Sequence, residues 1–218
     1  MSVGRRPPGL LPIPLLLSLS PLLAQRAQAP QGGLATAQLE KAPAFADRLG
    51  PFELLKTTKA DVRQRLGPAP AVPSREGAAL CYLDETGGLY VELRFGPSGG
   101  SETLTGYRLA ESPPRISSVG DCGRSPGLTE RLDAGGVRIG DGAEKLAAAL
   151  RLPGPLANGP RSFIYSERVP LTEARRKAFT REGTIPPGAD AWDLVYKIDV
   201  VVIDGRVSEL EVARTESF

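Results

Sequence analysis

Two stretches of the chain alternate apolar and polar residues with a period of two, as a strand with one buried face does. They are "LYVELRF" at residues 89–95 and "LVYKIDVVV", which begins at Leu194. Shorter stretches of similar character precede them, "ALCYLDE" and "SFIYSER", and others follow them, "LTGYRLAES" and "VSELEVARTES". The alternation therefore predicts two groups of three strands.

A short helix is predicted before each group of strands. Apolar residues four positions apart lie on one face of a helix, and such pairs occur at Val62 with Leu66 and at Leu146 with Leu150. The two patterns are offset by 84 residues at each of these matched positions: Leu55 and Ile139, Val62 and Leu146, Leu66 and Leu150. Capping signals for the first turn are present in both: Thr57 or Thr58 with Asp61, and Asp141 with Glu144.

The repeated order predicts an internal duplication and an α+β fold, with two tandem repeats of a helical segment packed on a three- or four-stranded antiparallel sheet. Residues 51–125 would form repeat 1 and residues 126–218 repeat 2, after a linker or short helical lead at residues 30–50. Repeat 2 carries an insertion at residues 170–191, in which residues 172–181 are predicted to form a short basic helix. That helix is either a solvated element held by Phe179 or a contact for a partner.

The dipeptide Asp204-Gly205 predicts the hairpin between the last two strands. A two-residue turn there would place Leu210 opposite Asp199 and mix apolar with charged side chains on one face. A three-residue loop at residues 204–206 would instead keep Ile198 on the same face as Val212. We therefore expect a bulged three-residue turn with Gly205 at positive φ.

The first 29 residues have the layout of a secretory signal peptide, with two arginines, an apolar run at residues 10–23, and then small and polar residues. The run is shorter than the ~20 residues that a membrane-spanning helix needs. Cleavage after Ala24 or Ala29 would leave a periplasmic or secreted chain without a stable membrane span. An uncleaved anchor is the alternative.

Cys81 and Cys122 are the only cysteines, and a pair in an exported chain favours a disulfide over two buried free thiols. A bridge between them would close a loop of about 40 residues, which contributes on the order of 3 to 4 kcal/mol to stability in the chain-entropy model.

The amino-acid composition limits the kinds of binding and catalysis expected of the chain. Apolar residues make up 41% of the chain, which is typical of a globular protein, and the net charge of +2 gives no electrostatic case for nucleic-acid binding. There is no histidine, so histidine-dependent catalysis is excluded and the commonest metal ligand is missing. We therefore predict no catalytic, cofactor or metal site. Two carboxylate pairs, Asp84 with Glu85 and Asp190 with Asp193, fit solvated turns better than an acid–base pair.

The strand positions that point away from the predicted helices form the candidate partner-binding surface. Its residues are Tyr90, Glu92, Arg94 and Arg108 in repeat 1 and Lys197 and Asp199 in repeat 2, with Glu209 and Glu211 beside them and Trp192 nearby. Tyr90 and Trp192 favour binding because aromatic residues are enriched at interface hot spots. The alternatives are an ordinary mixed-charge sheet surface, and a core position for Trp192.

The first helix pattern and its surroundings also resemble two known families. The pattern is carried by Phe52, Leu55, Thr58, Val62, Leu66, Gly67 and Pro70, and again by Ile139, Gly140, Leu146 and Leu150. It resembles the helix-and-sheet repeat of the SmpA/OmlA (BamE) family of outer-membrane assembly lipoproteins, and is similar to the tandem repeats of β-lactamase inhibitory proteins. The resemblance implies an exported, non-catalytic protein that works through protein contacts made by a curved sheet.

Together these observations predict an exported protein-binding module that acts through the exposed sheet face, in envelope assembly support or in inhibition of a secreted enzyme. The expected partner is another protein, with no nucleic acid and no metal involved. The alternative functions are a carrier of a small apolar ligand and a carboxylate-dependent hydrolase.

Overall fold

The computed structural model describes residues 36–39, 42–74, 77–96, 102–115, 119–173, 176–177 and 188–217. The chain from Gly33 onward forms one compact unit. The predicted signal peptide lies outside the described residues, as does most of the helix predicted in the insertion. The predicted lead at residues 30–50 contains strand β1 (Thr36–Leu39), the short 3-10 helix η1 (Ala44–Asp47) and strand β2 (Arg48–Leu49).

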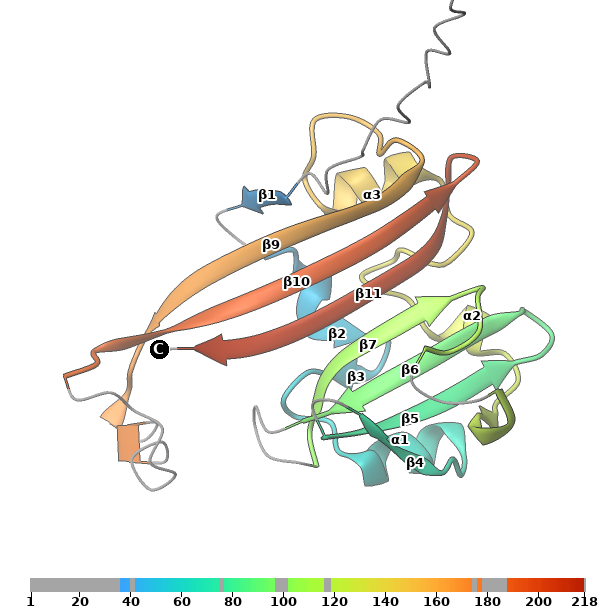
Figure 1. Ribbon diagram of the computed structural model, residues 1–218, viewed down its shortest axis with the longest axis horizontal. Helices are drawn as coiled ribbons and strands as arrows, with labels where there is room; N and C mark the ends of the chain where they lie inside the picture. The colour runs from blue at the N-terminus through green and yellow to red at the C-terminus, as the bar shows by residue number, and fades with distance from the viewer. Residues whose placement is uncertain are drawn as a thin grey trace, which may run out of the picture. The chain divides into compact units, whose positions relative to one another are not determined.

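A single sheet dominates the described chain (Figure 1). Its hydrogen-bonded order is β1-β9-β10-β11-β7-β6-β5-β4, and the short β8 pairs with β5. The further strands are β4 (Ala71–Ser74), β5 (Gly77–Asp84), β6 (Leu89–Phe95), β7 (Leu104–Ala110), β8 (Gly123–Arg124), β9 (Gly159–Pro170), β10 (Ala191–Ile203) and β11 (Arg206–Ser217). Neighbouring strands are antiparallel except at the β1–β9 and β5–β8 pairs. A separate two-stranded sheet joins β2 to β3 (Phe52–Glu53).

The predicted α+β fold with two helix-on-sheet repeats is wrong. The described chain is mostly β, and the strands of both expected repeats belong to the same sheet because β7 pairs with β11 from Gly106–Ala213 to Ala110–Glu209. The alternating pattern identifies the buried face of a strand but not its neighbour in the sheet. Two separate sheets would each leave an open edge at the third strand, and the β7–β11 pairing satisfies the backbone groups of both edges.

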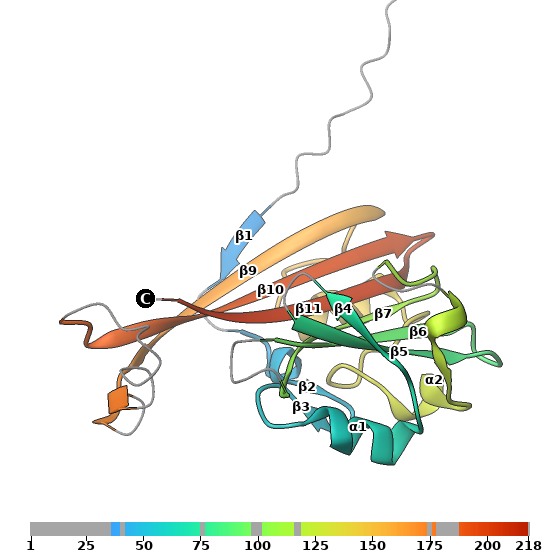
Figure 2. The same cartoon turned by 60° about the horizontal axis from the view of Figure 1, so that its bottom comes forward.

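The helices are short, and two of them lie with the β2–β3 pair on one side of the sheet, called the core face here (Figure 2), while the third packs on the same core. They are α1 (Lys59–Leu66), α2 (Leu128–Arg131) and α3 (Ala143–Ala149). Val62 and Leu66 of α1 and Leu146 of α3 are buried in the same hydrophobic core as the inward side chains of β5 to β7 and β9 to β11. Residues from both expected repeats therefore share one core.

The predicted cap of the first helix is confirmed and that of the second is wrong. Thr58 accepts a hydrogen bond from the Asp61 backbone N–H, and Asp61 accepts one from the Thr58 backbone N–H. The cap of α3 is Gly142, which offers no side-chain oxygen. Asp141 instead accepts hydrogen bonds from the Arg138 backbone N–H and the Lys145 side chain, so it stabilises the turn that precedes the helix.

The β10–β11 hairpin has a two-residue turn, so the predicted three-residue loop is wrong. Asp204 and Gly205 both have positive φ, 49° and 72°, as a type I′ turn requires. The register expected from the apolar pattern is nevertheless present, with Ile198 opposite Val212. A bulge between Val201 and Val202 restores it, because Ser208 is an extra residue on β11 and donates to the Val201 carbonyl at 3.2 Å.

Deleting Ser208 tests the role of this bulge. Without the extra residue, the remainder of β11 would slip by one position and turn its apolar side chains away from the core. We expect a large loss of the free energy of unfolding, measured by urea denaturation, or failure to fold. Asp204→Asn is the matched control because asparagine tolerates positive φ, and its stability should stay close to that of the wild type. A stable deletion variant with an unchanged β7–β11 pairing would contradict this role.

Candidate functional site

The predicted surface residues on the strands lie on the face of the sheet opposite the core face, called the outer face here. Cross-strand pairing places Glu92 of β6 opposite Arg108 of β7, and Arg108 opposite Glu211 of β11. The row continues through Asp199 of β10 to Ser162 of β9. Directly paired side chains project from the same face of a sheet, so this row crosses five strands as one continuous band of polar groups.

Trp192 does not belong to this surface. It is on the core face of β10, paired with Val169 of β9, and is only 2% exposed. The indole therefore contributes to the hydrophobic core, which was the alternative considered for it. The prediction that Trp192 helps to bind a partner fails at this point, because alternation along β10 gives odd-numbered positions to the outer face and even-numbered positions to the core.

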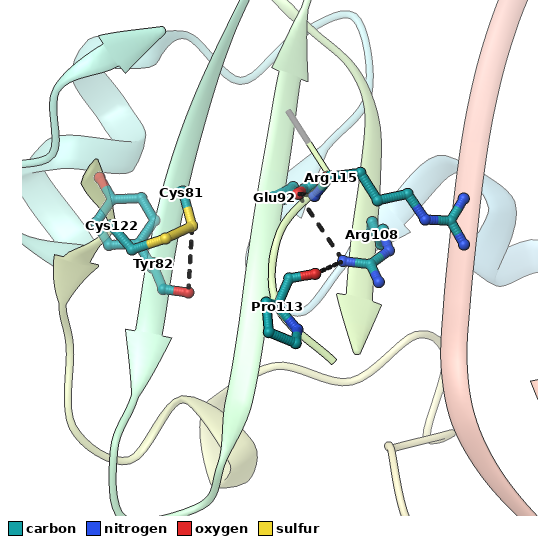
Figure 3. Close-up of a disulfide and its surroundings, with 7 residues drawn as sticks. All are labelled: Cys81, Tyr82, Glu92, Arg108, Pro113, Arg115 and Cys122. Carbon is teal, nitrogen blue, oxygen red and sulfur yellow. Dashed lines mark hydrogen bonds and ion pairs between the residues drawn. A yellow bond between two sulfur atoms is a disulfide. The ribbon is translucent and has the colours of Figure 1, made fainter. Parts of the chain in front are cut away.

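The predicted disulfide between Cys81 and Cys122 is present. Cys81 is opposite Glu92, so its sulfur atom lies on the outer face of β5. Residues 111–115 follow β7 directly and are called the strap here. Figure 3 shows strap residues Pro113 and Arg115 close to Glu92 and Arg108, with the disulfide on the neighbouring strand.

The strap contacts the outer face through polar groups. Arg108 donates to the Pro113 carbonyl at 3.4 Å and to the Ser112 hydroxyl at 2.7 Å. The Arg115 backbone N–H donates to Glu92 Oε1 at 2.6 Å, and the Arg115 guanidinium binds Glu209. As a result Glu92 is 0% exposed and Arg108 is 1% exposed, although both are outward strand positions.

Beneath the strap, carboxylates and guanidinium groups alternate. Arg108 pairs with Glu209 at 2.9 Å and lies 3.8 Å from Glu92, while Arg94 pairs with Glu211 at 2.6 Å. Burial opposes ionisation of Glu209, but the hydrogen bonds and positive charges of Arg108 and Arg115 outweigh it and lower the pKa of this carboxyl below its ordinary value. The Glu209 carboxylate is therefore charged at neutral pH.

The outer face thus has a covered half and an open half. On the open half, formed by β9 and β10, Lys197 has a side chain 56% exposed and pairs with Asp199 at 2.6 Å, while Ser162 donates to the other oxygen of Asp199. Ile203, at the end of β10, is 56% exposed. Partly exposed aliphatic residues surround this ion pair: Ile164, Val195 and Val201. Tyr90 and Arg94 lie on the outer face of β6 and are partly buried.

A cleft of about 650 Å³ lies on the other side of the molecule, between η1, the turn after β2, and the chain around residue 133. Its charged lining residues are Asp47, Arg48, Glu53, Arg131 and Asp133. Asp47 is engaged by the Tyr196 hydroxyl and by Arg214, each at 2.7 Å. Phe45 and Pro51 are among the uncharged residues that complete the lining, and the carrier of an apolar ligand stays a prediction.

Asp84 and Glu85, one of the two carboxylate pairs considered from the sequence, have separate partners. Asp84 is buried and accepts hydrogen bonds from Thr86, Gly87 and Thr129. Burial opposes its ionisation, but these hydrogen bonds outweigh that effect and lower the pKa of Asp84. The carboxylate therefore fastens the β5–β6 turn to the start of α2. The Glu85 carboxylate forms an ion pair with Arg124 instead.

Sequence reasoning missed Arg115 because the residue lies in a loop without periodicity. The two cysteines did indicate that the chain after β7 approaches the outer face. Alternation along β5 makes Cys81 an outward residue, and a bridge from there to Cys122 draws the chain after β7 onto the outer face.

No family model, curated protein or solved structure matches this chain. Within the described part of the chain, no helix is long and apolar enough to cross a membrane. The disulfide fits an oxidising compartment.

Arg108→Met tests the balance of charges under the strap. Removal of the guanidinium leaves Glu92 and Glu209 without their shared partner in a buried site, so we expect a loss of about 3–5 kcal/mol in the free energy of unfolding. The double variant Arg108→Met/Glu92→Leu removes one uncompensated charge and should recover much of this loss. Urea denaturation measures both, and a single variant as stable as the wild type would contradict the account.

The lowered pKa of Glu209 predicts a pH dependence. Its folded-state pKa is below the ordinary value of 4.5, so its contribution to stability is present above that pH and is lost as the pH falls through the folded-state pKa. The drop in unfolding free energy between pH 7 and pH 3 should therefore be smaller in Glu209→Gln than in the wild type. Equal drops in the two proteins would exclude a contribution from Glu209.

Proposed function

We propose that the protein is an exported, non-catalytic module that binds another protein through the open half of the outer face. The observation that carries this proposal is the composition of that half: a solvent-accessible ion pair, Lys197 with Asp199, surrounded by partly exposed aliphatic side chains on two long paired strands. Interfaces combine apolar contact area with charges that fix orientation.

The platform for this contact is a strand held by hydrogen bonds along both of its edges. β10 is hydrogen-bonded on both sides, to β9 from Ala191–Pro170 to Val202–Gly159 and to β11 from Asp193–Ser217 to Ile203–Arg206. A partner that docks on it would order little backbone, which lowers the entropic cost of binding. The side chains that touch the partner would come from alternate positions of each strand.

Export supports the same proposal. The apolar amino-terminal segment has the order of a signal peptide, and the Cys81–Cys122 disulfide is a bond that persists in oxidising compartments. The resemblance of the helix pattern to envelope assembly lipoproteins and to inhibitory proteins fits two roles in the periplasm or outside the cell. The partner is either a component of an envelope complex or a secreted enzyme that the protein inhibits.

Lys197→Glu tests the proposal. The tagged mature chain should retain a specific protein from envelope or secreted fractions, and reversal of this charge should lower the retained amount about tenfold through lost charge complementarity. Lys56→Glu is the matched control, because Lys56 is also exposed and paired with a carboxylate, Glu53 at 2.5 Å, away from the outer face. The free energy of unfolding of both variants should stay within about 1 kcal/mol of the wild-type value, as is usual for surface ion pairs. Equal retention by the two variants would contradict the proposal.

A further inference from the structure

The strap occupies the covered half of the outer face as a bound peptide would. Two strap backbone atoms contact side chains of the sheet: the Pro113 carbonyl accepts from Arg108, and the Arg115 N–H donates to Glu92. Both of these side chains are buried. A backbone carbonyl and a backbone N–H are present in any extended segment. These two contacts therefore recognise the conformation of the segment rather than its sequence.

We propose that the covered half is a recognition site for an extended, arginine-bearing segment of the partner protein, and that the strap fills this site in the isolated chain. The inference rests on the proposed function, because it supplies the partner chemistry for the covered half of the same outer face. The open half would then hold the partner first, and the covered half would add contacts once the strap is displaced.

The charges beneath the strap indicate that the partner segment carries an arginine. With the strap in place, three carboxylates, Glu92, Glu209 and Glu211, face three guanidinium groups, Arg94, Arg108 and Arg115. When the strap leaves, it takes Arg115 with it, and one carboxylate is left in excess. A guanidinium restores the balance and can bind two carboxylates at once, as Arg115 does with Glu209 and Glu211.

The strap is suited to exchange because it contributes little that a partner could not replace. Its sequence at residues 112–115 is Ser-Pro-Pro-Arg, and it places no large aliphatic or aromatic side chain on the sheet. Glu111, Ser112 and Pro113 are exposed, and the Arg115 side chain is 57% exposed. Buried ion pairs stabilise a fold weakly, so a competing segment that makes the same ion pairs faces a small energetic difference.

The site also has hydrogen-bonding capacity that the strap leaves unused. Among the described residues, Arg108 Nε has no hydrogen-bond partner, and Glu92 Oε2 has only the ion pair with Arg94 at 3.7 Å. Both atoms belong to side chains that are almost completely buried. A longer or better-placed segment would satisfy them, which gives a partner an advantage over the strap.

The disulfide sets how strongly the strap competes. It fixes Cys122, seven residues after the end of the strap, to β5, so the local concentration of the strap at the outer face is high. A variant without the disulfide loses this tether, and replacement of Arg115 removes the charge that the strap supplies. The two changes together should leave the site open for a peptide added in solution.

A peptide titration tests the proposal. The protein is the triple variant Cys81→Ser/Cys122→Ser/Arg115→Ala, and the probe is a blocked peptide with the sequence of residues 110–115, Ala-Glu-Ser-Pro-Pro-Arg. Backbone amide shifts in the NMR spectrum report binding. We expect saturable shifts in β6, β7 and β11, and binding about tenfold weaker both for a matched peptide with glutamine in place of arginine and for the wild-type protein with its strap in place.

A second variant and the glutamine peptide serve as controls for the peptide titration. If the triple variant does not fold, Arg115→Ala with the disulfide intact replaces it, and the arginine peptide should still bind this variant more tightly than the wild type. Equal binding of the arginine and glutamine peptides, shifts confined to the core face, or no saturable shift in a folded variant would each overturn the proposal. A partner retained through Lys197 in the absence of peptide binding would refute this inference alone and leave the proposed function standing.

Discussion

The antiparallel pairing of β7 with β11 is the constraint on which the rest of the structure depends. It joins strands that are about a hundred residues apart in the sequence, and it requires close approach at Gly106, where a Cβ atom would lie 2.7 Å from the Val212 carbonyl oxygen. Glycine alone fits this position without displacing backbone. The same pairing brings Arg108 beside Glu211. The hydrogen bonds that join β7 to β11 therefore also assemble the charged row on the outer face.

That charged row explains why the strap covers one half of the outer face and leaves the other half uncovered. Over β6 and β7 the charges are buried, and the strap supplies hydrogen bonds and a guanidinium that keep them paired. Over β9 and β10 the ion pair of Lys197 and Asp199 is accessible to solvent, where it costs little to leave uncovered. A buried charge needs a partner from the chain or from another molecule, and this requirement connects the fold to the proposed binding role.

Much of the local structure follows from the sequence, whereas the long-range arrangement does not. Alternation located β6 and β10 and gave the correct outward positions for Glu92 and Asp199, and the Thr58 cap follows from its spacing to Asp61. Alternation cannot specify that β7 joins β11, because the pairing involves backbone groups that every residue carries. The bulge at Ser208 was hidden for a similar reason, since a two-residue turn with a bulge and a three-residue turn give the same register beyond it.

The most direct test of the account places a photo-crosslinking amino acid at position 197, on the open half of the outer face, and separately at position 64. Gln64 is an exposed residue of α1, on the core side of the sheet, and serves as the matched position. After irradiation of cells that export the protein, we expect a covalent adduct to a specific protein from position 197 and none from position 64. Adducts formed equally from both positions, or from position 64 alone, would contradict the claim that the outer face is the binding surface.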